Sequence, residues 1–392
     1  MIREITKGIY SVGSNHRDRK VFDELIPLPD GTTYNSYLIQ GEKHNVLIDA
    51  VDPVKSEELI RNLKKLNIPV HYIVSHHAEQ DHSGAIPDVL KSFPDAKVLT
   101  NEKCKSFLMD LLFIPEEKFI VVKDREKFDI GGRTLEFIFT PWVHWPETMV
   151  TYLIEEKMLF SCDFFGSHYG TDDITIDIGE GIFEPAKRYY AEIMMPFRSV
   201  IKNNIKKLRE YEIKMILPSH GPIHKNPDFI INAYEDWISD NVKNKVIIPY
   251  VSMHGSVKNM VDYLSKKLDD MEIPVKTINL SGGDIGELAI ELVDAATVIL
   301  AVPTMLVNIH PVGAFALYLL NALKPKTRFI GLISSYGWGG NAVEFVKSQI
   351  PNLKAELLQP VLIKGNLKDD DKKLIDALAE NILNKHREIK II

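Results

Sequence analysis

The stretch SHHAEQDHSG, residues 75–84, contains the densest group of metal-binding side chains in the chain. Three histidines and two carboxylates fall between His76 and His82. An apolar, β-branched run, HYIV at residues 71–74, precedes the stretch, and a helix-like segment, SGAIPDVLKSF at 83–93, follows it. A strand that runs through a polar turn into a helix brings the turn side chains to one point beyond the strand end. The pattern therefore predicts a metal site there.

Further candidate ligands stand at other junctions between a strand and a loop. His144 lies in TPWVHWPETM (140–149), Asp163 in LFSCDFFG (159–166) and His220 in ILPSHGPIH (216–224), each just after an apolar run. Mixed imidazole and carboxylate ligands suit iron or manganese, and carboxylates can bridge two metal ions. The set predicts a site with two metals.

A regular alternation of strands and helices begins near residue 245. Five apolar runs alternate with five amphipathic segments up to the end of the chain. The predicted strands are 245–252, 274–280, 297–303, 327–335 and 355–363, and the helices are 256–271, 286–295, 313–323, 341–350 and 369–386. This pattern is typical of a doubly wound parallel sheet. We expect one domain over residues 1–243, which mixes short strands with helices such as a long one over 186–211, and another over 244–392.

Composition excludes several classes of protein. The chain has 392 residues and a formal net charge of −7, so nucleic acid is not an expected partner. No run of eighteen apolar residues and no leader-like start are present, so we expect neither a membrane span nor export. The two cysteines, Cys104 and Cys162, indicate no disulfide framework. A cytoplasmic enzyme is the expectation.

The spacing of the candidate ligands resembles that of the flavodiiron proteins, also called A-type flavoproteins. Their pattern is His-x-Glu-x-Asp-His, then a histidine, eighteen residues, an aspartate, and a late histidine in a Ser-His-Gly turn. The resemblance implies a metallo-β-lactamase-like αββα sandwich followed by a flavodoxin-like sheet. It also implies a non-haem diiron site. The implied ligands are His77, Glu79 and His144 on one iron, Asp81, His82 and His220 on the other, and Asp163 as the bridge.

The same residues include the candidate catalytic residues and leave a zinc enzyme as an alternative interpretation. Glu79, Asp163 and His168, which follows Asp163 closely, are the candidate catalytic residues. Glu79 stands where zinc hydrolases of this fold have histidine, so it favours iron over zinc. A zinc-dependent hydrolase with an accessory flavodoxin domain remains an alternative.

Three loops of the second half predict an FMN site. The first, YVSMHGSVKNM (250–260), resembles the flavodoxin phosphate loop, (Ser/Thr)-x-Thr-Gly-x-Thr, with His254 and Val257 as departures from it. Hydroxyls and backbone N–H groups at a helix N-terminus bind phosphate. The other two loops are AVPTMLVNIHP (301–311) and SSYGWGGN (334–341). The candidate FMN contacts are Ser252, Met253, His254, Gly255, Ser256, Val257, Pro303, Thr304, Met305, Asn308, Ser335, Tyr336, Gly337, Trp338 and Gly339.

Together the two sites predict an electron relay. FMN would feed a diiron site that reduces dioxygen to water, with reduction of nitric oxide to nitrous oxide as the alternative. A pure electron carrier that uses only its flavin is a third hypothesis, which the full ligand set disfavours. The family implies a separate electron donor, rubredoxin or a reduced deazaflavin. It also implies a head-to-tail homodimer or a dimer of dimers, in which the FMN of one subunit faces the irons of the other.

Overall fold

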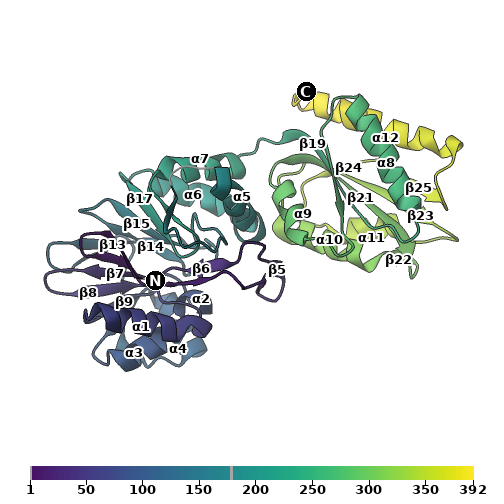
Figure 1. Ribbon diagram of the computed structural model, residues 1–392. Helices are drawn as coiled ribbons and strands as arrows, with labels where there is room; N and C mark the ends of the chain where they lie inside the picture. The colour runs from purple at the N-terminus through teal and green to yellow at the C-terminus, as the bar shows by residue number, and fades with distance from the viewer. Residues whose placement is uncertain (1, 177–179) are drawn as a thin grey trace. The chain divides into compact units, whose positions relative to one another are not determined.

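The computed structural model describes residues 2–176 and 180–392, and the chain divides into two compact units, Met1–Ile238 and Ser239–Ile392 (Figure 1). We predicted a boundary after residue 243, which is the first residue of a strand of the second unit. Among the described helices, none has both the length and the apolar character that a membrane span requires.

The first unit is built around two sheets that share an apolar core. One sheet has the order β1-β2-β7-β8-β9-β10-β11 and the other β12-β13-β14-β15-β17-β18-β16. The strands of the first are β1 (Arg3–Thr6), β2 (Ile9–Ser11), β7 (Tyr37–Gln40), β8 (Asn45–Ile48), β9 (Tyr72–Val74), β10 (Lys97–Thr100) and β11 (Phe119–Val121). Those of the second are β12 (Lys127–Asp129), β13 (Thr134–Phe139), β14 (Met149–Leu153), β15 (Met158–Cys162), β16 (Thr175–Ile176), β17 (Met215–Pro218) and β18 (Ile223–His224). Two small hairpins, β3 (Ser14–His16) with β6 (Thr32–Tyr34) and β4 (Val21–Phe22) with β5 (Ile26–Pro27), stand apart from both.

Apolar side chains from both sheets form this shared core. Strands β7, β8, β10, β13, β15 and β17 contribute buried residues, among them Ile39, Ile48, Leu99, Phe137, Phe160 and Leu217. Helices cover the outer faces, with α1, α3 and α4 on one side and α5, α6 and α7 on the other (Figure 1). The bounds are α1 (Ser56–Leu66), α2 (Gln80–Ser83), α3 (Ile86–Ser92), α4 (Glu102–Leu112), α5 (Glu180–Tyr189), α6 (Arg198–Leu208) and α7 (Pro227–Ile238). The unit is the predicted αββα sandwich.

The second unit is a doubly wound sheet. Its strand order, β20-β19-β21-β23-β24, with β25 also paired to β23, is the 2-1-3-4-5 order of flavodoxin. The strands are β19 (Lys243–Tyr250), β20 (Val275–Asn279), β21 (Ala295–Met305), β22 (Asn308–Ile309), β23 (Phe329–Tyr336), β24 (Glu356–Leu357) and β25 (Val361–Lys364). The helices are α8 (Ser256–Asp270), α9 (Ile285–Leu292), α10 (Pro311–Leu323), α11 (Ala342–Gln349) and α12 (Asp369–Glu388). Both predicted domain folds are therefore confirmed.

Two predicted elements differ in detail, and proline explains both. The predicted long helix over 186–211 is interrupted between α5 and α6 by a π turn, Tyr190–Met194, and a 3-10 turn, Met195–Phe197. Pro196 has no N–H to continue the α-helical hydrogen bonds. Similarly, the predicted strand over 355–363 is divided into β24 and β25, because Pro360 between them cannot donate to a strand ladder.

Candidate functional site

The strand ends of the first unit bring all seven predicted metal ligands together. His77 and Glu79 follow β9, whereas Asp81 and His82 lie in the short helix α2. His144 lies between β13 and β14, Asp163 follows β15 directly, and His220 follows β17. In the ligand set every histidine presents its Nε2 atom to a carboxylate oxygen.

Two strand ends beside the site turn in an unusual backbone conformation. Asp49 after β8 and Cys162 at the end of β15 both have φ of 52°, in the left-handed region that most residues avoid. Such strain persists only where the surroundings hold it, and it is common at functional sites. At Cys162 the turn precedes Asp163, whose two oxygens face the two groups of candidate ligands.

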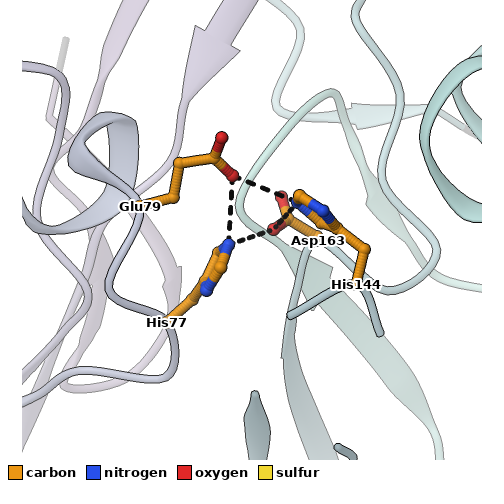
Figure 2. Close-up of side chains that lie close together, drawn as sticks. All are labelled: His77, Glu79, His144 and Asp163. Atoms are coloured by element: carbon orange, nitrogen blue, oxygen red, sulfur yellow. Dashed lines mark hydrogen bonds and ion pairs between the residues drawn. The ribbon is translucent and has the colours of Figure 1, made fainter. Parts of the chain in front are cut away.

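His77, Glu79, His144 and Asp163 form one group (Figure 2). Glu79 Oε2 lies 3.0 Å from His77 Nε2 and 3.1 Å from His144 Nε2. Asp163 Oδ2 lies 3.6 Å and 3.5 Å from the same two nitrogens. An ion about 2.1 Å from each donor atom would place neighbouring donors about 3.0–3.4 Å apart. The four measured separations, 3.0–3.6 Å, are close to that range.

Asp81, His82 and His220 form the second group, on the other oxygen of Asp163. His82 Nε2 lies 2.9 Å from Asp163 Oδ1 and 3.3 Å from Asp81 Oδ1. His220 Nε2 lies 3.0 Å from Asp81 Oδ2 and 3.5 Å from Asp163 Oδ1. Asp163 thus faces one group with each oxygen, which is the geometry of a bridging carboxylate. His82, which the family resemblance assigns to the second iron, points into the site.

The polar atoms of the site lack the partners that a metal-free pocket needs. Both carboxylate oxygens of Asp81, Nε2 of His82 and Oδ2 of Asp163 are buried and make no well-aligned hydrogen bond in the described chain, where their contacts are ion pairs with the other ligands at 2.9–3.6 Å. A buried polar atom left unpaired costs about 1–3 kcal/mol, and more when it is charged. Divalent cations between these atoms remove that cost. Three carboxylates, the buried Asp81 and Asp163 and the partly buried Glu79, would also supply the negative charge that two such cations need.

The charges within the site couple its imidazoles to its carboxylates. Burial alone would lower the pKa of His77, His82 and His144, but nearby carboxylates raise each pKa to about 10. Burial would conversely raise the pKa of Glu79, and the hydrogen bonds from His144 and His77 lower it instead. Protons therefore occupy the imidazoles until a metal replaces them.

Buried groups behind the ligands fix the orientation of the imidazoles. Glu147 Oε1 lies 2.7 Å from His77 Nδ1, and both side chains are fully buried. The Nδ1 of His220 lies 2.6 Å from the carbonyl oxygen of Thr33. An Nδ1–H donated in this way leaves Nε2 free as the metal-binding atom. Glu147 and Thr33 were absent from the sequence prediction, although Glu147 stands in the same segment as His144.

Tyr189 is a further residue that the sequence prediction missed. The Tyr189 hydroxyl donates to Asp163 Oδ1 at 2.7 Å, from the end of α5, where the π turn begins. No regular sequence spacing relates Tyr189 to Asp163, so this contact could not be predicted from the sequence. Burial and the charge of Asp163 hold the pKa of Tyr189 well above its usual value, so the phenol remains a hydrogen-bond donor.

The two other histidines near the site have different surroundings. His76 is fully buried, with Nδ1 2.7 Å from Asp49 and Nε2 2.7 Å from Thr151, so both ring nitrogens have structural partners. His168 has Nδ1 2.9 Å from the Thr32 hydroxyl, and its buried Nε2 has no hydrogen-bond partner in the described chain. Burial and His220 lower the pKa of His168, so this ring is neutral beside the second ligand group.

The candidate FMN loops lie at the carboxyl ends of β19, β21 and β23. Gly255, at φ 86°, precedes α8, and in the first turn of that helix the Lys258 N–H donates to Ser252 Oγ at 3.2 Å. Leu306 and Val307 turn the β21–β22 hairpin with φ of 50° and 70° and expose 81% and 67% of their surface. Trp338 is 94% exposed. Phosphate-binding N–H groups and an uncovered apolar surface are the two features that a flavin phosphate and ring require.

A cavity of about 180 Å³ joins two of these loops. Thr304, Tyr336 and Gly339 line it, as does Ser334, whose buried hydroxyl has no partner in the described chain. Ser334 lies within β23 and was absent from the FMN contacts predicted from the loops. Val257, in contrast, is fully buried in the core of this unit with Met260 and Leu264. Its side chain therefore faces the core, and only its backbone is available at the start of α8.

Comparisons with known proteins agree with this geometry. Residues 32–221 match the family described as "ODP family beta lactamase". The chain is 36% identical to a nitric oxide reductase of Moorella thermoacetica over 90% of each chain. Among solved structures, rubredoxin oxygen:oxidoreductase of Desulfovibrio gigas has a TM-score of 0.95 and 27% identity over 99% of each chain. The flavodiiron protein of Giardia intestinalis has a TM-score of 0.92 and 26% identity over 99% of this chain and 98% of its own.

The chain belongs to the flavodiiron protein family. Proteins of this family bind FMN and a non-haem diiron centre, and both candidate sites here have matching chemistry.

Proposed function

We propose that this flavodiiron protein is an oxygen reductase that converts dioxygen to water, using four electrons and four protons. The observation that carries the proposal is the pair of buried ligand groups on the two oxygens of Asp163, in a chain that also has a flavodoxin-like unit. The bound metals would supply oxidant binding and electron transfer, and FMN would accept electron pairs and release single electrons. The similarity to rubredoxin oxygen:oxidoreductase supports dioxygen as the substrate.

Reduction of nitric oxide is the second candidate function. Two nitric oxide molecules, two electrons and two protons yield nitrous oxide and water, and the same ligand set would serve. The similarity to the nitric oxide reductase of Moorella thermoacetica supports this activity.

The protein's own residues perform the tasks that surround this chemistry. We assign one metal to His77, Glu79 and His144, the other to Asp81, His82 and His220, and the bridge to Asp163. Tyr189 holds one oxygen of Asp163 in place. The assigned FMN contacts are the predicted loop residues, with Val257 contributing through its backbone alone.

Electrons for the flavin would come from a separate protein or cofactor, a rubredoxin or a reduced deazaflavin. The two cysteines of this chain, Cys104 and Cys162, are both buried and cannot form a four-thiolate electron-transfer centre. We place the enzyme in the cytoplasm, where such donors are found in their reduced form.

A head-to-tail homodimer would bring the flavin of one copy to the metals of the other. Each unit has exposed apolar side chains around its candidate site. Val21, Val54 and Leu111 line the cavity in front of Glu79, and Leu306 and Trp338 are exposed at the flavin loops. Pairing of two copies would cover both surfaces.

Complementation between inactive variants tests this pairing. One variant carries Asp163→Ala, and the other carries bulky substitutions at Gly255 and Gly337 that block FMN. Mixed dimers, formed by dissociation and reassociation, regain oxygen uptake if the two sites meet across subunits. Failure of mixed dimers to regain activity would contradict the head-to-tail arrangement.

Oxidant uptake tests the function itself. The iron- and FMN-loaded protein, supplied with chemically reduced flavin, should consume dioxygen without accumulating peroxide, and the rates with dioxygen and nitric oxide rank the two substrates. Asp163→Ala is the matched control, because it removes the bridge and leaves the flavin unit intact. Absence of uptake of either oxidant by the fully loaded protein would refute the proposal.

A further inference from the structure

The β4–β5 hairpin places a carboxyl group at the mouth of the metal site. Strands β4 and β5 pair antiparallel, and the turn between them begins with Asp23. Asp23 and Glu24 have φ of 49° and 52°, in the left-handed region, although neither is glycine. Backbone held in this region at a non-glycine residue is common where a side chain has a function.

The hairpin is attached firmly beside the second ligand group. Arg19 donates to the Tyr34 hydroxyl at 2.5 Å and to Asp52 at 2.7 Å. The Phe22 ring lies under the Arg19 guanidinium, at 5.2 Å, and against the His168 ring, at 4.8 Å. Phe22 thus covers the His168 side of the site, and the next residue, Asp23, is at the opening.

A cavity of about 650 Å³ connects Asp23 with the ligands. Asp23, Glu79 and Asp81 line it, together with Trp145 and the cation Arg19. The other ionisable groups in its wall are His16, Glu24 and Asp52.

The surroundings of these carboxyl groups single out Asp23. Asp52 accepts hydrogen bonds from Arg19 and the backbone of Val54, and Glu79 and Asp81 are assigned to the metals. Of the two remaining carboxyl groups in the wall, Asp23 directly follows Phe22, and Glu24 lies one residue further along the turn.

We propose that the Asp23 carboxyl carries protons from solvent to the oxidant in the cavity in front of Glu79 and Asp81. This inference rests on the proposed function, in which each dioxygen takes up four protons and four electrons, the electrons coming from the reduced donor through FMN. In each transfer the O–H bond of Asp23 breaks, an O–H bond forms on the oxidant oxygen, and the carboxylate takes another proton from solvent. Reduction of two nitric oxide molecules uses the same path for two protons.

The protonation behaviour of Asp23 suits this role. Asp23 is exposed to solvent at the opening; desolvation and the charges of Glu79 and Asp81 raise its pKa, and the charges of His144 and Arg19 oppose this. A carboxyl group that reaches both solvent and the cavity can take up a proton on one side and donate it on the other.

Substitution of Asp23 tests the proposal. Asp23→Asn removes the proton but suits the turn, because asparagine tolerates the left-handed region. Asp23→Glu retains the acid, and Asp18→Asn is the control, with the same chemical change on an exposed side chain of the same segment. Oxygen uptake is measured against pH, in H₂O and D₂O, on protein with full iron and FMN content. Infrared difference spectra across the same pH range follow the carboxyl titration independently of turnover.

The proposal predicts that Asp23→Asn lowers kcat about tenfold, increases the solvent isotope effect and loses one titrating carboxyl band. Asp23→Glu should restore most of the rate, and Asp18→Asn should behave like the wild type. A wild-type kcat and isotope effect in Asp23→Asn would overturn the role of Asp23 alone. Inactive wild-type protein with full cofactor content would instead refute the proposed function.

Discussion

Glu147 should control the affinity of the metal site although it contacts no metal. Its carboxylate accepts hydrogen bonds from His77 Nδ1 at 2.7 Å and from the backbone N–H of Ala78 at 3.1 Å. Loss of a hydrogen-bond partner from a metal-binding histidine typically lowers metal affinity about 10–100-fold, which corresponds to about 1.4–2.7 kcal/mol of binding free energy. Glu147→Gln retains an acceptor and loses the charge, so we expect the lower end of that range. Glu147→Ala also leaves the Nδ1–H of His77 buried without a partner, so we expect the upper end or more.

Chelator competition for iron(II) under anaerobic conditions measures this effect. The matched control is Glu117→Gln, which makes the same chemical change on an exposed side chain. Circular dichroism confirms that each variant is folded before titration. Wild-type iron affinity in both Glu147 variants would refute the argument that the hydrogen bond to His77 strengthens the site.

Three further outcomes follow from single contacts. Tyr189→Phe removes the hydroxyl bonded to Asp163 and should weaken iron binding up to about tenfold in the same chelator assay, while both irons still bind. Burial lowers the pKa of His386 to about 4, so the unfolded state binds more protons than the folded state below pH 6.5, and stability falls as the pH falls. The free energy of unfolding should be lower by about 2 kcal/mol at pH 5 in denaturant titrations. His386→Gln keeps a hydrogen-bond partner for Thr297 and should lack this pH dependence. Glu79→His should shift metal preference towards zinc and abolish oxidant uptake, which elemental analysis of protein from medium with both metals would check; iron loading with full turnover would contradict it.

The ligand set was predictable because its chemistry is concentrated at strand ends. His77, Glu79, Asp81 and His82 fall within six consecutive positions, and the remaining ligands each follow an apolar run that ends at the same edge of the sandwich. The partners of these ligands were not predictable in the same way. Tyr189 and Thr33 reach the site from distant segments through tertiary packing, and neither has a spacing relation to the residue it contacts.

The position of Val257 could have been predicted from the sequence, but the resemblance to the phosphate loop outweighed the helical periodicity. Val257 belongs to the apolar stripe of α8 with Met260, Val261, Leu264 and Leu268, at helical spacing, so its core position agrees with the periodicity rather than with the phosphate-loop alignment. A Val257→Thr substitution would therefore bury a hydroxyl in the core and should not tighten FMN binding.

The content of iron, zinc and FMN per chain tests the central claim most directly. Protein purified from cells supplied with both metals is analysed for metals by elemental analysis and for flavin by absorbance, and the iron-loaded form is examined by Mössbauer spectroscopy. The account predicts two irons and one FMN per chain, with the two irons magnetically coupled through their shared ligands. Two zinc ions per chain, or two irons that behave as isolated centres, would contradict a diiron site bridged by Asp163.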